Sequence, residues 1–233
     1  MMSKLRQPKR QETKAVSLIT MADKSSPVSE QYRTIRTNIQ YAMVDRELKT
    51  LVVTSSGPGE GKSTSSANIA IVFANAGQKV LLVDADMRKP TIAKTFAVSN
   101  TRGLSSLLSN RNTSLEQVVQ PVGIDNLSVI TSGPKPPNPS ELLGSVKMNQ
   151  LIKDLKREYD LVIFDMPPVV TVTDAQIVAS KADGTMLVVR ENVSKKDSML
   201  KAKTLLQMVN ANVIGVIYNG AKNASDQGYY YGN

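Results

Sequence analysis

Apolar residues in this chain form short uninterrupted runs, separated by stretches in which they recur every three or four positions. We expect the runs to be strands, and they cover residues 51–54, 79–84, 127–131, 161–165, 185–189 and 213–218. The helical spacing covers residues 29–43, 63–76, 104–109, 114–119, 145–157, 174–181 and 195–209, and Ser29 is the expected N-cap of the first. Apolar strands that alternate with helices are typical of a parallel sheet covered on both faces. The pattern predicts an α/β fold with a doubly wound, mainly parallel sheet of about seven or eight strands.

The two ends of the chain depart from this pattern. Residues 1–26 are mostly polar and close with a Ser-Ser-Pro segment, so we expect a flexible basic arm there. Residues 27–222 are the predicted domain, and residues 223–233 are expected to be a flexible, tyrosine-rich tail. Residues 134–139 are rich in proline and lie between predicted strands, so we expect a stiff surface loop.

Composition narrows the chemistry that is available. The chain has no Cys and no His, which excludes thiol nucleophiles, imidazole bases and metal sites built on either residue. No apolar run approaches the ~20 residues that cross a bilayer, and the basic N-terminal segment lacks the apolar stretch of a secretory signal. We therefore expect a soluble chain. The net charge of +9 indicates an anionic partner, and the basic N-terminal residues fit either a solvated arm or weak attraction to anionic lipid.

A glycine-rich segment, residues 54–64 (TSSGPGEGKST), directly follows the first predicted strand and opens the next predicted helix. This is the context of a P-loop, in which glycines let successive backbone N–H groups face phosphates at the positive end of a helix dipole. We expect Lys62 to contact the β- and γ-phosphates of ATP or ADP, and the Ser63 hydroxyl to bind Mg²⁺. The predicted nucleotide-binding residues of the segment are Gly57, Pro58, Gly59, Glu60, Gly61, Lys62, Ser63 and Thr64. Ser56 stands where the usual first glycine of the motif would be.

Aspartates follow the carboxyl ends of two predicted strands. Asp84 and Asp86 end one strand, where alternation places them on one face, and Asp165 ends another. Ligands of doubly wound sheets bind at this edge, and a charge that follows an apolar run is costly unless it meets a cation. We therefore expect these carboxylates, together with Ser63, to hold Mg²⁺. A capping or salt-bridged aspartate is the alternative for each of them.

Together these motifs resemble the bacterial tyrosine kinases known as BY-kinases, which regulate capsule and exopolysaccharide synthesis. Pro58 to Lys62 is similar to the Walker A motif of that family, with Ser56 also typical of it. Asp84, Asp86 and Arg88 resemble its Walker A′ motif, and the Asp-Met-Pro-Pro segment that begins at Asp165 resembles its Walker B motif. The resemblance runs from about residue 28 to the C-terminus. The absence of a membrane-spanning segment is similar to the Gram-positive type, in which the activator is a separate chain.

The resemblance implies an ATP- and Mg²⁺-dependent protein-tyrosine kinase. Lys62 is then a catalytic residue, Asp84 the general base for the tyrosine hydroxyl, and Asp86 a metal or water ligand. A modest base suffices, because a phenol of pKa ~10 loses its proton only late in a loose transition state. Arg88 is expected either to pair with phosphate or to have a structural role. Asn219, after the last predicted strand, is the candidate adenine contact.

Two further segments resemble parts of the same family. Glu30, Arg33 and Arg36 share one face of a predicted helix and resemble its oligomerisation motif, with an ordinary solvated face as the alternative. The tail resembles its C-terminal tyrosine cluster, through Tyr229, Tyr230 and Tyr231. A ring of subunits would present one tail to the Asp84 of the next subunit, which implies autophosphorylation in trans. Each phosphate adds about −1.5 to −2 charges, so we expect phosphorylation to loosen the oligomer.

The implied partners are the cytoplasmic tail of a transmembrane chain-length regulator and an opposing tyrosine phosphatase, with no specific nucleic acid. The regulator would complete the nucleotide site and recruit a cytoplasmic kinase to the inner face of the membrane. The main alternative is a partition-type P-loop ATPase (ParA/MinD-like), which transfers nothing to protein. Such proteins usually carry a signature lysine five residues before the P-loop lysine, where this chain has Gly57. A purely regulatory nucleotide-binding subunit is the third possibility.

Overall fold

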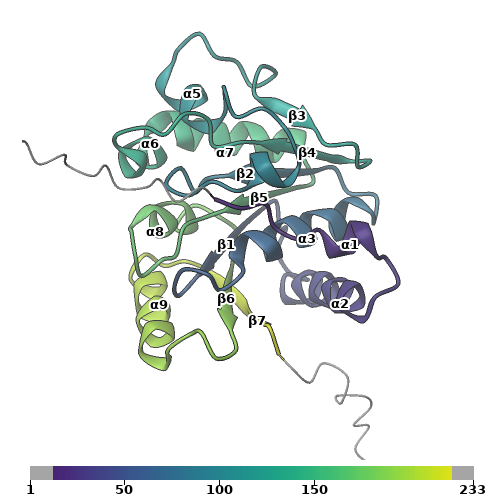
Figure 1. Ribbon diagram of the computed structural model, residues 1–233. Coiled ribbons are helices and arrows are strands. Elements are labelled where there is room, and N and C mark those ends of the chain that lie inside the picture. Colours follow the sequence, from purple (N-terminus) through teal and green to yellow (C-terminus); the bar gives the residue numbers. More distant parts are fainter. Residues whose placement is uncertain (1–12, 222–233) are drawn as a thin grey trace, which may run out of the picture.

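A seven-stranded sheet with the strand order β3-β4-β2-β5-β1-β6-β7 runs through the middle of the molecule, between two layers of helices (Figure 1). The computed structural model describes residues 13–221. Every neighbouring pair of strands is parallel except β3 and β4. The strands are β1 (Thr50–Ser55), β2 (Val80–Asp84), β3 (Val119–Pro121), β4 (Leu127–Ile130), β5 (Leu161–Asp165), β6 (Gly184–Arg190) and β7 (Val213–Asn219). The predicted doubly wound, mainly parallel α/β fold is confirmed.

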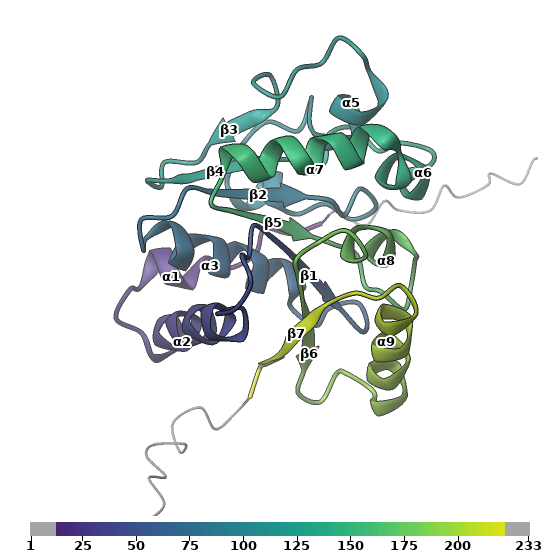
Figure 2. The ribbon, with the colours of Figure 1, turned by 180° about the vertical axis from the view of Figure 1, so that it is seen from behind.

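Helices cover both faces of this sheet, as the two opposite views show (Figures 1 and 2). One face carries α1 (Ile19–Ala22), α2 (Pro27–Ala42), α3 (Lys62–Ala74) and α4 (Ile92–Thr95). The other carries α5 (Leu104–Ser109), α6 (Pro139–Gly144), α7 (Val146–Glu158), α8 (Asp174–Ala179) and α9 (Lys196–Met208). No helix of the described residues is long and apolar enough to span a membrane.

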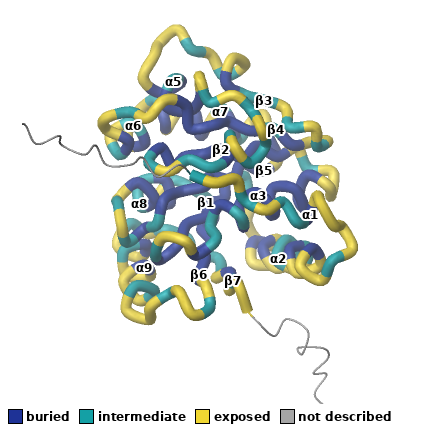
Figure 3. The backbone as a smooth tube through the Cα atoms, viewed as in Figure 1, coloured by how far each residue is buried: buried dark blue, intermediate teal, exposed yellow. Residues whose placement is uncertain are grey.

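Alternate residues of each strand enter separate hydrophobic cores. In β1, Val52 contacts the core beneath α5 to α9, whereas Leu51 and Val53 contact the core beneath α1 to α4. The central strands are therefore buried along their whole length (Figure 3). Burial on both faces explains why these strands read as continuous apolar runs rather than as an alternating pattern.

Three local predictions differ from the structure. Residues 114–119 do not form the expected helix but turn into the edge strand β3. The N-cap of α2 is Ser26 instead of Ser29, because the Ser29 N–H donates to the Ser26 side chain over 3.1 Å. Pro27 occupies the first helical position, where its missing N–H costs nothing. The proline-rich loop ends earlier than expected, because Pro139 is buried and begins α6.

Part of the predicted flexible arm lies against the body of the protein. The backbone N–H and hydroxyl of Thr20 donate to the Asn68 side chain on α3 over 3.0 and 2.8 Å. Asn68 in turn donates to the Ser17 carbonyl over 2.8 Å, and the Val16 N–H donates to the Thr95 hydroxyl. The prediction of a free arm is therefore wrong for residues 16–22, while residues 1–12 lie outside the described part of the chain.

Candidate active site

The glycine-rich loop connects β1 to α3 at the carboxyl edge of the sheet. Gly59 and Gly61 have φ angles of 78° and 97°, in the left-handed region that favours glycine. Within the described residues, no group accepts a hydrogen bond from the N–H groups of Gly59, Glu60 or Gly61. These N–H groups precede the first turn of α3, which begins at Lys62. Free backbone donors at the positive end of a helix are the arrangement that binds phosphate.

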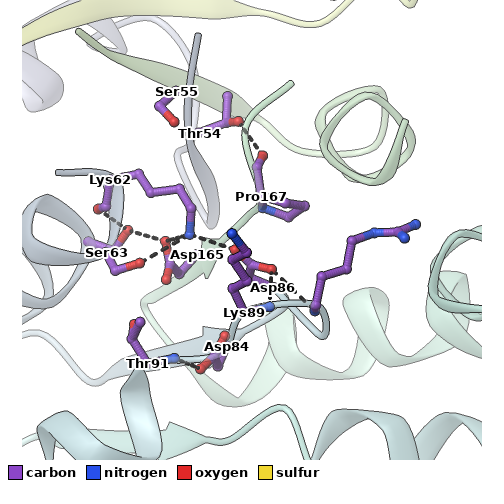
Figure 4. Close-up of polar contacts among 12 residues, drawn as sticks. Thr54, Ser55, Lys62, Ser63, Asp84, Asp86, Lys89, Thr91, Asp165 and Pro167 are labelled. Atoms are coloured by element: carbon purple, nitrogen blue, oxygen red, sulfur yellow. Dashed lines mark hydrogen bonds and ion pairs between the residues drawn. The ribbon is translucent and has the colours of Figure 1, made fainter. Parts of the chain in front are cut away.

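The ammonium of Lys62 lies between Asp86, in the turn after β2, and Asp165, at the end of β5 (Figure 4). Its Nζ atom is 2.9 Å from Asp86 Oδ2 and 3.4 Å from Asp165 Oδ1, and it is 3.1 Å from the Ser63 hydroxyl. Burial alone would lower the pKa of Lys62, but the charges of Asp165 and Asp86 outweigh burial and raise it. The structure thus brings together residues from β1–α3, β2 and β5 that are far apart in sequence.

Asp84 is fully buried and held from one side only. Its Oδ2 atom accepts from the N–H groups of Thr91 and Ile92, both over 3.0 Å, at the start of α4. Its Oδ1 atom and the Oδ2 atom of Asp165 are buried and have no partner in the described residues. Burial, together with the charge of the neighbouring Asp165, raises the pKa of Asp84 to about 8. Burial also raises the pKa of Asp165, although Lys62 opposes this effect.

These oxygens fit the ligand preference of Mg²⁺. Among the described residues, no three acidic side chains converge closely enough to hold a metal on their own. Magnesium that arrives with a nucleotide needs fewer protein ligands, because phosphate oxygens and water supply the rest of its octahedron. The Ser63 hydroxyl and the unpartnered oxygens of Asp84 and Asp165 are hard oxygen donors of the type that Mg²⁺ prefers.

Arg88 is engaged away from the glycine loop. Its guanidinium donates to both carboxylate oxygens of Asp174 over 2.8 and 3.0 Å, and the Ser140 hydroxyl also donates to Asp174. Asp174 is fully buried at the start of α8. Of the two roles expected for Arg88, this geometry favours the structural one over phosphate pairing.

Asp86 organises the turn that follows β2. Its Oδ1 atom accepts from the N–H groups of Arg88 and Lys89 over 3.2 and 2.9 Å, while its other oxygen contacts Lys62. The side chain therefore joins the glycine loop to the segment that carries Arg88.

Glu60 points its side chain into the loop. The carboxylate is buried and accepts from the Ser56 hydroxyl, the Gly57 N–H and the Ser194 hydroxyl over 2.7, 2.9 and 2.5 Å. Asn219, the candidate adenine contact, ends β7 and donates to the Glu60 carbonyl over 3.0 Å. Asn219 therefore lies at the loop. Because the Glu60 side chain is engaged within the loop, only the backbone of Glu60 remains to contact a nucleotide.

Sequence reasoning missed Asp174, Arg190 and Ser194. Arg190 donates to the Gly59 carbonyl over 3.1 Å, so it contacts the glycine loop like Ser194. Both residues lie in or beside the polar connection between β6 and α9, and no motif distinguishes that connection. The sequence points only weakly to Asp174, as an acidic residue at the start of a predicted helix.

The other predicted functional residues lie elsewhere. Glu30 and Arg33 form an ion pair on the exposed face of α2. Arg36 donates to the Val72 carbonyl over 3.1 Å, near the end of α3 opposite to Lys62. The tyrosines predicted as phosphorylation sites, Tyr229, Tyr230 and Tyr231, lie outside the described residues.

Comparison with known proteins gives consistent matches. Residues 48–211 match the sequence profile of a family described as AAA domain. The tyrosine-protein kinase YwqD of Bacillus subtilis is 49% identical over 216 residues, which cover 92% of this chain and 91% of YwqD. The crystal structure of the chimerical protein CapA2B2 matches with 42% identity and a TM-score of 0.83, covering 88% of this chain and 92% of that one. The kinase domain of Escherichia coli tyrosine kinase ETK matches with 34% identity and a TM-score of 0.86, covering 98% and 89%.

Proposed function

The chain belongs to the bacterial tyrosine kinase family, of the Gram-positive type, and on this premise we propose that it uses ATP and Mg²⁺ to phosphorylate protein tyrosines. The observation that supports this most is the Lys62 ammonium, which lies between Asp86 and Asp165 beside the glycine loop. That arrangement combines a cation, free backbone donors and acidic oxygens, which are the parts a phosphoryl-transfer site needs.

Each part has a proposed role. The loop from Gly57 to Thr64 holds the phosphates, and Lys62 neutralises the charge that develops on them during transfer. Ser63, Asp86 and Asp165 would hold the metal directly, and Asp84 would lie beside it with its Oδ1 atom open to accept a proton. Magnesium supplies further neutralisation of the phosphate oxygens when it is bound. Asn219 contacts the adenine side of the nucleotide, beside its contact with Glu60.

The transfer itself needs little from the protein beyond alignment and charge. The phenol oxygen forms a bond to the γ-phosphorus while the bond to the bridging oxygen of ADP breaks. We assign the phenol proton to Asp84, whose Oδ1 atom has no partner in the described residues. Asp86 orients Lys62 through their 2.9 Å contact.

The proposed substrates are the tail tyrosines Tyr229, Tyr230 and Tyr231 of a neighbouring subunit. We propose that Glu30, Arg33 and Arg36 on α2 contact that neighbour in a homo-oligomeric ring. The first two are exposed enough for such a contact, with 67% and 38% of their side-chain surfaces accessible. Phosphorylation of several tyrosines would make the tail anionic and loosen the ring, and a tyrosine phosphatase would reverse it.

The proposed setting is the inner face of the cell membrane. A separate activator chain would recruit the cytoplasmic kinase there through its tail, and the chimeric nature of the solved relative CapA2B2 supports a two-chain system. In this setting the kinase would regulate capsular or exopolysaccharide synthesis. No specific nucleic acid is needed for this function.

A partition-type ATPase is the second candidate, because it shares the fold. Its signature lysine is replaced here by Gly57, whose N–H instead donates to the Glu60 side chain over 2.9 Å. That reading also gives the tail tyrosines no role.

The deciding experiment is incubation with magnesium-ATP, with and without candidate activator tails, read by phosphotyrosine mass spectrometry. Lys62→Met and Asp84→Ala chains are the controls. We expect phosphate on Tyr229 to Tyr231 that is lost in both variants. ATP hydrolysis without phosphotyrosine under any activator would instead support the partition-type ATPase.

A further inference from the structure

The glycine loop is held from outside by side chains of the C-terminal part of the chain. Arg190 donates to the Gly59 carbonyl over 3.1 Å, and Asn219 donates to the Glu60 carbonyl over 3.0 Å. Ser194 donates to the Glu60 carboxylate over 2.5 Å. These three residues come from the end of β6, the β6–α9 connection and the end of β7, and none of them belongs to a nucleotide-binding motif.

The first two contacts fix the direction of backbone N–H groups. A trans peptide is planar, so its C=O and N–H point in opposite directions. A hydrogen bond that holds the Gly59 carbonyl therefore also aims the N–H of Glu60, and one that holds the Glu60 carbonyl aims the N–H of Gly61. Neither N–H has an acceptor among the described residues. Arg190 and Asn219 thus turn both donors away from themselves.

Asn219 also fits closely against Gly61. A Cβ atom at Gly61 would lie 2.0 Å from the Asn219 side-chain nitrogen, and the φ angle of Gly61 is 97°. The absence of a side chain at Gly61 is what lets Asn219 reach the Glu60 carbonyl. The contact is therefore part of how the loop is built and not an incidental surface contact.

The third contact acts through Glu60. A buried carboxylate is costly unless donors satisfy it, and Glu60 has the Ser56 hydroxyl, the Gly57 N–H and the Ser194 hydroxyl. The first two donors belong to the loop, so they close the loop on itself. Ser194 is the donor that ties the closed loop to the β6–α9 connection. Its own oxygen accepts from the Arg190 N–H over 2.7 Å, which links Ser194 to Arg190.

We propose that Arg190, Ser194 and Asn219 are positioning residues that hold the phosphate-binding N–H groups in their binding orientation, a role that Asn219 has in addition to its proposed adenine contact. The inference rests on the proposed nucleotide site and adds residues to it. Preorganised donors favour bound phosphate in the ground state and the transition state alike. Loss of a positioning residue therefore raises KM for ATP and leaves kcat nearly unchanged.

The test measures the binding of a fluorescent ADP analogue with Mg²⁺ to the full chain. We expect Ser194→Ala and Asn219→Ala each to weaken binding about tenfold, because each removes one hydrogen bond that orders the loop. Arg190 is exposed, so Arg190→Met is expected to weaken binding about threefold. Ser194→Thr keeps the hydroxyl and is expected to bind within about twofold of the parent chain. Ser180→Ala is the matched control, since its exposed hydroxyl donates to the Ile177 carbonyl outside the site.

Hydrogen exchange of the chain without added nucleotide gives a second readout. The Glu60 and Gly61 amides are expected to change their exchange rates in Ser194→Ala and Asn219→Ala but not in Ser180→Ala. Parent-like ADP binding in the alanine variants would overturn the proposal and leave the proposed kinase function intact. The proposal would also be overturned if Ser194→Thr bound ADP as weakly as Ser194→Ala. The same holds if the alanine variants lost ADP binding together with a general loss of thermal stability. A parent chain that binds no nucleotide would overturn the proposed function itself.

Discussion

Asp84 and Asp165 lie side by side, in register, at the ends of the neighbouring parallel strands β2 and β5. Both are fully buried, and Asp86 lies just beyond them. Lys62 contributes a single positive charge against these three carboxylates. The cluster is therefore arranged for a ligand rather than for the stability of the fold.

Neutralising Asp84 should stabilise the protein and abolish its activity. In Asp84→Asn, the side-chain oxygen still accepts from Thr91 and Ile92, while repulsion with Asp165 disappears. We expect the free energy of unfolding without Mg²⁺ to rise by about 1 to 2 kcal/mol, and phosphotyrosine formation to fall at least about 100-fold. Urea unfolding and kinase assays check this, with the exposed Asp125→Asn as control. Lower stability together with full activity would contradict it.

Arg88 should matter for stability more than for nucleotide affinity. Arg88→Ala leaves the buried Asp174 carboxylate with the Ser140 hydroxyl as its remaining partner, so we expect a loss of about 3 kcal/mol in urea unfolding. ADP affinity of the folded variant should stay within about twofold. If Arg88 instead binds phosphate, affinity would fall about tenfold or more while stability changes little.

Asp183 should make stability depend on pH at the acidic end. Burial opposes ionisation of Asp183, but hydrogen bonds from Lys156 and Thr50 prevail and lower its pKa below the usual value near 4. Since the folded pKa is the lower one, the stabilisation is complete above about pH 4 and is lost as pH falls through the folded pKa. We expect Asp183→Asn to cost about 1 to 2 kcal/mol at pH 7, and this difference to shrink toward pH 3. Urea unfolding across that range measures it, and a difference that does not change with pH would refute the assignment.

Substitutions of Arg33 and Arg36 should distinguish an effect on assembly from an effect on the stability of the fold. Arg33 pairs with Glu30 and donates to the Lys24 carbonyl, both at an exposed surface where such contacts are worth about 0.5 kcal/mol each, so Arg33→Ala should change assembly mass with little loss of stability. Arg36 donates to the Val72 carbonyl, so Arg36→Ala should also cost about 1 kcal/mol. Light scattering and thermal unfolding distinguish the two effects. Arg157→Ala, which breaks another exposed pair of the same spacing, is the control. Unchanged mass in both α2 variants would rule out this face as the interface.

The central strands were predictable because their burial on both faces leaves a continuous apolar run. The short helices and strands were not predictable, because contacts between residues distant in sequence determine where they form. The helix α4 begins where the N–H groups of Thr91 and Ile92 donate to Asp84, a contact that no local spacing reveals. The edge strand β3 has only three residues, and the apolar residues before it, Leu115 and Val118, resemble a helical stripe.

The site was predictable to the extent that its residues follow strands. Lys62, Asp84, Asp86 and Asp165 were found because the carboxyl ends of parallel strands meet at one edge. Sequence spacing could not show that Arg88 pairs with Asp174, since these residues meet only through the packing of α8 against the turn after β2. Ser194 and Asn219 likewise reach the glycine loop only because the fold brings together segments that are distant in sequence.

The position of β1 in the sheet also decides when this protein can first hold ATP. β1 carries the glycine loop, yet its two neighbours, β5 and β6, are made from residues more than 100 positions later. A partly synthesised chain therefore has the loop sequence but no sheet to support it. Under the proposed function, nucleotide capture needs a chain synthesised at least through β6, and ATP would selectively stabilise chains that have folded that far.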